Sequence, residues 1–396
     1  MRILVANDGL SDVGGVQSYL DCVLSGLAAR GHAVAIVSCS DSGRPEVRAV
    51  NRQFESFTIA AGRNAALAAV RSWAPDVCFS HNVNDLTLEQ ALVDAFAVVK
   101  FMHGYFGTCI GSQKMHAFPS PVPCERRFGP ACLALYLPRH CCRLDPRTLV
   151  TYWRWTSAQH RLLASYRTIV VASRHMRVEF ERNGVEEDRI AVNPLFSTMR
   201  PVAAGAPLPI EPTVMFLARM TSLKGGDLLI KAVDIAQRRL GRRIHLVMAG
   251  DGPRRAEWEE LARRLNVESA FPGWVSGEDR HAWLARASVA ALPSTWPEPF
   301  GLVGLEAAAA GVPTVAFDVG GISEWLRHEV NGVAVPAPPS AEAFASALAG
   351  VLGDERRLTS LRAGARRLAD EMTLGAHLDR LETTFDAVRR PLLAVS

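Results

Sequence analysis

Long hydrophobic runs are scarce in this sequence of 396 residues, and no stretch approaches the roughly 18–20 uncharged apolar residues of a membrane-spanning helix. An integral membrane protein with helical spans is therefore excluded. The opening MRILVANDGLSDVGG has one basic residue and a very short apolar run, so we expect a buried strand there rather than a signal peptide. Eight cysteines in so long a chain also exclude a small disulfide-held secreted scaffold, and we expect a cytoplasmic protein with reduced thiols.

Two short motifs are missing as well. DGLSDVGG, after the first expected strand, lacks the Gly-x-Gly-x-x-Gly spacing that brings backbone to a dinucleotide pyrophosphate, which disfavours a dehydrogenase. There is no obvious Asp-x-Asp pair of the kind that would hold a divalent cation. With 48% hydrophobic and 21% charged residues, the composition is nevertheless that of a folded protein.

The chain alternates short β-branched runs with longer amphipathic patterns, which predicts an α/β fold with two doubly wound (Rossmann-like) domains facing a central cleft. Expected strands of the first domain are 1–6, 32–38, 76–81, 98–103 and 168–173, with a helix at 16–31. A Pro-rich linker at 193–213 separates it from a second domain, whose rhythm restarts at 214–219. We place the domains at 1–197 and 198–375, with a C-terminal helix in 376–396 that we expect to pack back on the N-terminal domain.

Positive charge is concentrated in one part of the chain. Residues 100–177 contain twelve Lys or Arg and only two acidic residues, a net charge of +10, which leaves −6 for the rest. Such an excess suits a phosphate or lipid headgroup. Thr151-Tyr152-Trp153-Arg154-Trp155 mixes aromatic and charged side chains, which suits a membrane interface, although a solvated helix with buried tryptophans explains it equally well.

The most informative segment runs from Pro297 to Ala307. Glu298 lies in a Pro-flanked loop after an expected strand, and Glu306 follows eight positions later inside a helix that we expect to begin near Gly301. The free N–H groups of a helix N-terminus favour a phosphate. Two carboxylates flanking such a site suit a nucleotide-sugar. The alternative is that Glu306 is an early helix residue favoured by the dipole and Glu298 a solvated loop charge.

Two further turns favour the ligand interpretation. Arg219 and Lys224 follow the strand at 214–219, where two cations could neutralise a pyrophosphate. Gly250 belongs to a tight turn, Ala249 to Pro253, where backbone could approach a ligand closely.

Together these segments resemble the retaining family-4 glycosyltransferases (glycosyl transferases group 1), which have the GT-B fold. The resemblance includes Phe271-Pro272-Gly273-Trp274-Val275, Gly14-Gly15-Val16, Gly311-Val312-Pro313 and Asn331-Gly332, and covers almost the whole chain in the family's order. It implies an N-terminal acceptor-binding domain and a C-terminal donor-binding domain.

The resemblance also implies roles for residues of the second domain. Arg219 and Lys224 would bind the pyrophosphate, Glu298 the transferred sugar and Glu306 the ribose hydroxyls. On the donor side, Gly250 would lie in the close turn, Trp274 and Val275 beside the base, and the backbone of Gly301, Leu302 and Val303 beside sugar and phosphate.

In the first domain, His103 would point into the cleft near the donor sugar, or simply cap a strand. Gly14 and Gly15 would form the loop that lets acceptor and phosphate approach, or a plain tight turn.

The implied function is retaining, metal-independent transfer of a hexosyl or related sugar from a nucleotide-sugar to a glycan or lipid-linked acceptor, in polysaccharide or glycoconjugate biosynthesis. No cofactor and no nucleic acid are expected. The acceptor could carry lipid pyrophosphate, and the protein could lie at the anionic inner membrane face as a peripheral protein. The alternative is a catalytically silent nucleotide-sugar-binding subunit of a glycan-assembly complex.

The sequence departs from the family in a Cys- and Arg-rich insert at about 107–150, which we expect on the acceptor side. Its cysteines Cys109, Cys124, Cys132 and Cys141 are separated by 14, 7 and 8 residues, and Cys142 is adjacent to the last. These spacings do not match paired CxxC zinc sites. Structural zinc, disulfides and packed reduced thiols all stay open.

Overall fold

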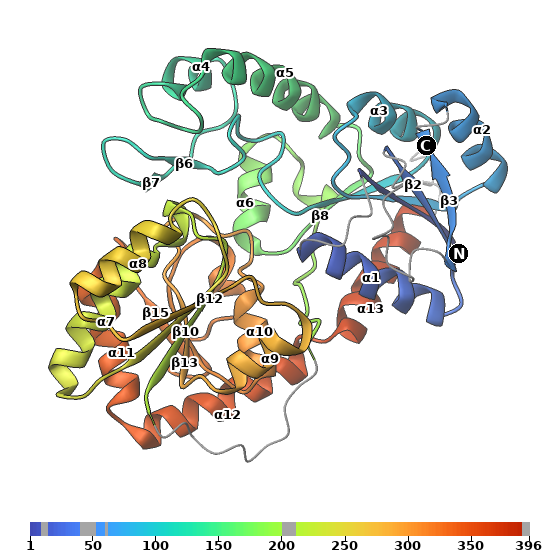
Figure 1. Ribbon diagram of the computed structural model, residues 1–396. Coiled ribbons are helices and arrows are strands. Elements are labelled where there is room, and N and C mark those ends of the chain that lie inside the picture. The colour runs from blue at the N-terminus through green and yellow to red at the C-terminus, as the bar shows by residue number, and fades with distance from the viewer. Residues whose placement is uncertain (9–14, 40–52, 60–61, 200–210, 390–396) are drawn as a thin grey trace. The chain divides into compact units, whose positions relative to one another are not determined.

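The structure is a computed structural model that describes residues 1–8, 15–39, 53–59, 62–199 and 211–389 (Figure 1). It divides into two compact units. The first comprises Met1–Pro194 together with the C-terminal segment from Leu374, and the second comprises Leu195–Thr373. The boundaries expected from sequence were 197 and 375.

The first unit is built on a seven-stranded parallel sheet with the strand order β3-β2-β1-β4-β5-β8-β9. The order reverses between β1 and β4, which pair directly with Ile3 opposite Val77. The strands are β1 (Arg2–Asn7), β2 (Ala33–Ser38), β3 (Glu55–Thr58), β4 (Val77–Ser80), β5 (Val98–Met102), β8 (Thr168–Val171) and β9 (Ile190–Val192). Most central strands are buried along nearly their whole length, as expected for a parallel sheet covered on both faces.

Helices cover the sheet because each carries an apolar stripe at helical spacing. In α1 (Gly15–Ala29), the buried stripe is Leu20, Val23, Leu24 and Leu27. The other helices of the sheet are α2 (Arg63–Trp73), α3 (Leu86–Ala95), α5 (Pro146–Leu162) and α6 (Arg174–Arg182). Asp85 and Asp145 cap α3 and α5 by accepting hydrogen bonds from backbone N–H groups in the first turn.

Between β5 and α5 the chain is largely irregular. It contains a two-stranded antiparallel ribbon of β6 (Met115–His116) and β7 (Val122–Pro123), and one short helix, α4 (Ala131–Tyr136). This is the Cys- and Arg-rich insert, and its lack of periodicity in sequence reflects its lack of regular structure.

The second unit repeats the architecture with a six-stranded parallel sheet, in the order β12-β11-β10-β13-β14-β15. Its strands are β10 (Thr213–Leu217), β11 (His245–Ala249), β12 (Ser269–Gly273), β13 (Val289–Leu292), β14 (Thr314–Phe317) and β15 (Gly332–Val335). Its helices are α7 (Gly226–Leu240), α8 (Arg255–Arg264), α9 (Gly277–Ala285), α10 (Val303–Ala309), α11 (Ala341–Leu352) and α12 (Glu355–Glu371). The strand order reverses between β10 and β13.

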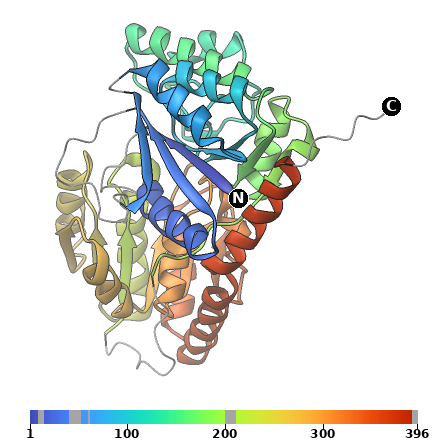
Figure 2. The same cartoon turned by 90° about the vertical axis from the view of Figure 1, so that its right-hand side faces the viewer.

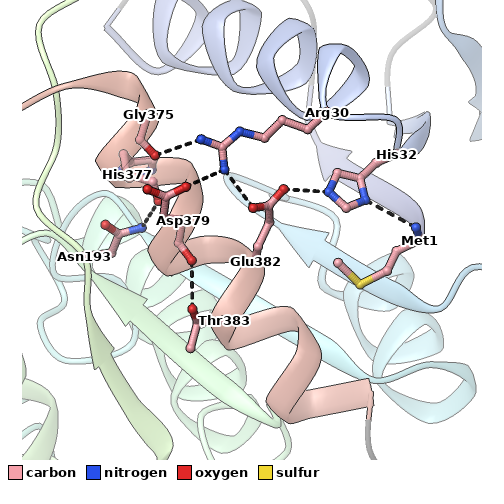
Figure 3. Close-up of polar contacts among 9 residues, drawn as sticks. All are labelled: Met1, Arg30, His32, Asn193, Gly375, His377, Asp379, Glu382 and Thr383. Carbon is pink, nitrogen blue, oxygen red and sulfur yellow. Dashed lines mark hydrogen bonds and ion pairs between the residues drawn. The ribbon is translucent and has the colours of Figure 1, made fainter.

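The last helix, α13 (Leu374–Arg389), belongs to the first unit, where it packs on α1 and β4 (Figure 2). Figure 3 shows the polar contacts that hold it. Arg30 donates to Asp379 and Glu382 at 2.7 Å each, and His32 Nε2 lies 2.7 Å from Glu382. His377 is buried, with its Nδ1 2.8 Å from the carbonyl oxygen of Pro194.

The prediction of two doubly wound α/β units is thus confirmed. The predicted strands, the helix predicted at 16–31 and the predicted C-terminal helix appear with shifts at their ends, whereas the helix expected from Gly301 begins only at Val303. Residues 200–210 of the expected linker lie outside the described residues. No helix in the described part of the chain has the length and apolar character needed to cross a bilayer.

Candidate functional site

Two loops of the second unit meet where its strand order reverses. One follows β10 and carries Arg219 and Lys224, and the other follows β13 and carries Glu298. A backbone hydrogen bond of 2.9 Å from Thr295 N–H to the Leu223 carbonyl joins the two loops. Ligands of open α/β sheets bind at the carboxyl ends of the strands at such a reversal. The fold therefore brings three of the predicted residues to the edge where a ligand is expected.

Lys224 and Glu298 form the central ion pair of this edge. Lys224 Nζ lies 2.6 Å from Glu298 Oε1, and the Ser294 hydroxyl donates to the same oxygen at 2.5 Å. The Glu298 side chain is 8% exposed and that of Lys224 is 25% exposed. The lysine also lies over the ring of Trp296, 5.3 Å from its centroid. Glu298 is therefore a fixed carboxylate and not the solvated loop charge of the alternative interpretation.

The backbone around Glu298 is held by the loop after β14. The N–H of Gly321 donates to the Glu298 carbonyl at 2.6 Å. Gly320 has φ 59°, and a Cβ there would lie 2.4 Å from the same carbonyl oxygen, so only glycine fits. Trp325 Nε1 donates to the Phe300 carbonyl at 2.7 Å, and its ring fills the space where Gly304 would carry a Cβ. These contacts fix the loop that connects Glu298 to α10.

Glu306 lies inside α10 and is 3% exposed. Its carboxylate pairs with Arg280 of α9, whose Nη1 lies 2.9 Å from Oε1. Burial raises the pKa of Glu306 above its ordinary value, and the charge of Arg280 acts in the opposite direction. Arg280 was not predicted as a site residue, because it lies in an ordinary amphipathic helical pattern that carries no motif.

Arg219 is exposed at the end of β10, and its side chain makes no hydrogen bond or ion pair with the described residues. The loop that carries it packs closely on the turn after β11. Gly250 has φ 128°, and a Cβ there would lie 2.0 Å from the Ala218 carbonyl oxygen. This glycine therefore permits a close approach to the neighbouring loop that carries Arg219, and so helps to position that loop.

The remaining donor-side candidates occupy turns of the same unit. Trp274, directly after β12, is 65% exposed, and Val275 beside it is half-buried. Gly301 has φ 83°, Leu302 is the N-cap of α10, and Val303 is its first residue.

In the first unit, His103 lies at the end of β5 and contacts a second histidine. Its Nε2 is 2.9 Å from Nδ1 of His81, at the end of β4. Burial and the positive charge of Lys100 lower the pKa of His103 to about 3, and burial lowers that of His81 well below its ordinary value. Both rings are neutral near pH 7, which allows one proton to be shared between the two nitrogens. His81 was not predicted as a site residue. Its position at the end of a strand, next to the reversal of strand order, could have indicated it.

Aromatic rings hold the pair in place. His103 stacks on Phe101 with centroids 4.5 Å apart, and Tyr19 of α1 meets it edge-on at 5.4 Å. Gly15 is the first residue of α1, with open space where a Cβ would be, and Gly14 lies outside the described residues.

The cysteines of the insert are all free thiols, and four of them line one pocket of the first unit: Cys109, Cys124, Cys132 and Cys141. Over the described ranges, no three or more His, Cys, Asp or Glu side chains are arranged as the ligands of a metal ion.

The structure thus joins Lys224 to Glu298 directly and places Glu306, Arg219 and Gly250 in the same unit. His103 and Gly15 lie in the other unit.

Comparisons with known proteins agree with the division of the chain into two units. The model of Glycosyltransferase Family 4 matches residues 13–196, and that of Glycosyl transferases group 1 matches residues 207–368. An uncharacterised glycosyltransferase of Methanocaldococcus jannaschii is 38% identical over 36% of this chain and 36% of its own length. D-inositol 3-phosphate glycosyltransferase of Jonesia denitrificans is 34% identical over 40% of this chain and 39% of its own length. The matches therefore span less than half of these relatives.

A solved structure extends the likeness to the whole fold. HepE of Anabaena, in complex with UDP, superposes with a TM-score of 0.69 over 98% of this chain and 100% of its own, at 19% sequence identity.

Proposed function

This chain belongs to glycosyltransferase family 4, with the GT-B fold, and on that basis we propose that it moves a sugar from a nucleotide-sugar donor to a glycan or lipid-linked acceptor. The proposed reaction retains the anomeric configuration and uses no metal ion. The observation that carries the proposal is the Lys224–Glu298 ion pair, with a buried carboxylate and a half-buried lysine, at the strand-order reversal of the second unit.

In the proposed site the second unit holds the donor. Arg219 and Lys224 offset the charge of the pyrophosphate, which grows on the leaving group as the glycosidic bond breaks. Glu298 accepts hydrogen bonds from hydroxyls of the transferred sugar, and its own orientation is fixed by Lys224 and Ser294. Glu306 accepts hydrogen bonds from the ribose hydroxyls. The exposed face of Trp274 is available to the base.

The proposed retention follows from attack on the leaving-group face. The acceptor hydroxyl approaches an oxocarbenium-like sugar from the side that the pyrophosphate leaves, and the departing phosphate takes the hydroxyl proton. The side chains named above then act by positioning the donor and by stabilising charge electrostatically. None of them needs to form a covalent bond to the sugar.

We assign the acceptor to the first unit. His103 is neutral, so it can donate or accept a hydrogen bond without placing a positive charge beside the oxocarbenium-like sugar. Gly15 is the first residue of α1 and has open space where a Cβ would be. Gly14 is included in this proposal because of its place in the sequence motif, since it lies outside the described residues.

Exposed side chains of the insert and of the first turns of α5 suggest what the acceptor is and where the protein is located. Ten large hydrophobic side chains are exposed in the described part of the chain, and seven of them lie between residues 118 and 152: Phe118, Val122, Leu133, Leu137, Leu144, Val150 and Tyr152. Exposed arginines, among them Arg143 and Arg147, lie in the same stretch. Apolar side chains among cations suit the interface of an anionic membrane, so we propose peripheral association and a lipid-linked or phosphate-bearing acceptor. The relative from Jonesia is named for an inositol phosphate acceptor.

The first test is thermal unfolding with UDP, GDP, ADP and dTDP and their sugar conjugates, with and without EDTA. A ligand at about a hundred times its dissociation constant should stabilise the fold by about 2.7 kcal/mol. We expect one nucleotide to raise the melting temperature, independently of EDTA, and the rise to disappear in Arg219→Ala combined with Lys224→Ala. Lys231→Ala, which removes an exposed cation of α7, serves as the matched control.

Glu298→Gln separates transfer from binding when thermal unfolding is combined with a measurement of nucleotide release from the sugar donor. We expect it to keep the nucleotide shift and to lose release of nucleotide from the sugar donor. Equal loss of both would refute the role of Glu298. Binding without any release by the unmodified protein would favour the alternative, a catalytically silent nucleotide-sugar-binding subunit.

A further inference from the structure

Two histidines end neighbouring parallel strands of the first unit. His81 directly follows β4, and His103 directly follows β5. A hydrogen bond of 2.9 Å joins His81 Nδ1 to His103 Nε2, and we call the two residues the histidine pair. A hydrogen bond between two ring nitrogens contains one proton, so one ring donates and the other accepts. Which ring donates decides what the remaining nitrogen of each ring can do.

The two rings differ in their surroundings. His81 is 1% exposed and packs against the rings of Phe79 and Phe101, with centroids 4.2 and 5.9 Å from its own. Its second nitrogen, Nε2, is buried and has no hydrogen-bond partner among the described residues. His103 is only half-buried, and its second nitrogen, Nδ1, makes no hydrogen bond with the described residues either. Nδ1 of His103 is therefore the nitrogen that remains for a ligand of the first unit.

The backbone of His81 is held from both sides. Its N–H donates to the Ala6 carbonyl, at the edge of β1, at 2.8 Å. Its own carbonyl accepts a hydrogen bond of 2.5 Å from Nζ of Lys100, in β5. This lysine is buried and pairs with the buried Glu89 of α3 at 2.9 Å. The position of His81 is thus fixed by three neighbouring elements of the unit.

Both rings of the pair are neutral near pH 7. Neither ring bonds to a carboxylate in the described part of the chain. Burial lowers the pKa of both rings, and the positive charge of Lys100 lowers it further. A neutral imidazole carries one proton, on either Nδ1 or Nε2, and the hydrogen bond made by one nitrogen determines the state of the other.

Two arrangements of the protons satisfy the hydrogen bond within the pair. If His103 Nε2 donates, His81 must carry its proton on the buried Nε2, where the described residues offer no acceptor. If His81 Nδ1 donates, its Nε2 is a lone pair close to the cation that bonds to the carbonyl of the same residue, Lys100. A buried N–H without an acceptor is rare in proteins, whereas a lone pair near a positive charge is favoured. The second arrangement is therefore the more stable one.

We propose that His81 is a positioning residue that fixes His103 in the tautomer protonated at Nδ1. His103 then presents an N–H to the ligand of the first unit. It can hold a hydroxyl oxygen of the sugar, but it cannot act as a general base through Nδ1. The departing phosphate is then left to take the hydroxyl proton, as in the proposed mechanism. The role towards the substrate rests on the proposed function, whereas the tautomer does not.

The first test is nuclear magnetic resonance of the full chain labelled with ¹⁵N-histidine, in which two-bond proton–nitrogen correlations show which nitrogen carries the proton. Spectra are recorded at about pH 8, where neutral imidazoles predominate. His160 and His377 are internal references, because Nδ1 of each lies 2.9 and 2.8 Å from a backbone carbonyl oxygen, which can only accept. We expect His81 and His103 to show the same Nδ1–H pattern, with each signal assigned by its loss on substitution.

His81→Phe keeps an aromatic ring but removes the donor. The His103 signal should then move towards the Nε2–H form that unconstrained histidines favour. We expect the rate of nucleotide release from the sugar donor, at saturating substrate, to fall at least about tenfold, while the thermal shift with nucleotide is unchanged. His81→Asn should restore most of the rate, because its amide can donate from nearly the same place as Nδ1. The exposed His328→Asn is the matched control and should release nucleotide as the unmodified protein does.

Three results would overturn the proposal: an Nε2–H form of His81 or His103 in the unmodified protein, a His103 signal that is the same in His81→Phe, or an unchanged rate in that variant. If His81→Phe fails to fold, the spectra of the unmodified protein and the rate of His81→Asn decide. Absence of nucleotide release by the unmodified protein would instead refute the transferase function, and the spectra alone would then decide the tautomer.

Discussion

Arg280 determines the charge state of the carboxylate that we assign to the ribose. Glu306 is buried, and burial raises its pKa, so without the arginine 2.9 Å away the carboxyl would bind a proton more readily. A protonated Glu306 is a weaker acceptor for ribose hydroxyls. We therefore expect Arg280→Gln to weaken nucleotide binding by about tenfold, equivalent to about 1.4 kcal/mol, with a larger loss as the pH falls from 8 to 6. Isothermal titration across that range measures it.

Arg280→Lys should restore most of the affinity, because it keeps the positive charge. Arg286→Gln, at the exposed end of the same helix, is the matched control and should bind as the unmodified protein does. An Arg280→Gln variant with unchanged affinity at every pH would show that the ion pair serves the fold only.

The same residues show how far sequence reasoning reaches at this scale. Lys224 and Glu298 could be predicted because each follows a strand, and parallel strands deliver their carboxyl ends to one edge. Their direct contact, and the Ser294 hydroxyl beside it, could not be predicted, because loop conformation depends on distant residues such as Gly320 and Trp325. Arg280 could not be predicted as a site residue, because charged residues are common on amphipathic helices and only the structure shows which partner this one has.

Elements with strong periodicity were predictable, and those without it were not. The helices α1, α7 and α13 have apolar residues at helical spacing, and the buried central strands are continuous apolar runs. The insert has neither pattern, so α4 and the ribbon of β6 and β7 were missed. The helix near Gly301 starts two residues late, because Gly301 has φ 83° and is not helical.

The exposed apolar side chains and arginines of the insert and of the first turns of α5 predict binding to anionic vesicles. Leu144 and Val150 are 54% and 50% exposed, so a membrane can bury them without a change in the fold. We expect Leu144→Ser combined with Arg147→Gln to weaken binding to phosphatidylglycerol-containing vesicles at least about tenfold, since an apolar side chain contributes about 1.5–3 kcal/mol and a cation about 1 kcal/mol. Sedimentation with vesicles, at low and high salt, gives the comparison.

Val330→Ser combined with Arg243→Gln removes the same two kinds of exposed side chain from the second unit and should leave sedimentation unchanged. Equal binding by both double variants would refute a membrane surface on the insert. Binding that is unaffected by salt would refute its electrostatic part.

For the whole molecule, the packing of α13 on the first unit has a consequence for stability. His377 Nε2 is 2.9 Å from the Tyr19 hydroxyl of α1, and the Asn193 side chain donates to the His377 carbonyl at 3.1 Å. One buried histidine therefore joins the start of the chain, the end of β9 and the final helix. Figure 3 shows this side chain beside the ion pairs of Arg30 and Glu382. Protonating it would place a charge at the centre of these contacts.

Stability should therefore fall in mild acid. Burial lowers the pKa of His377 to about 4, below its ordinary value of about 6.5, so in this range the unfolded chain binds the proton more readily than the folded one. The contribution of the neutral ring is complete above about pH 6.5 and declines as the pH falls towards 4. Between pH 7 and 5 this histidine alone should account for about 2 kcal/mol of lost stability. Denaturant unfolding at each pH measures the loss.

A variant separates this histidine from the other titrating groups. His377→Asn cannot take up the proton, so we expect its stability to be lower at pH 7 but to decline less steeply, by about 2 kcal/mol between pH 7 and 5. The exposed His328→Asn should decline in parallel with the unmodified protein. Parallel declines for all three proteins would mean that His377 is already protonated in the fold at pH 7, or is equally accessible to protons in both states. Either result would contradict the packing of α13 that buries it.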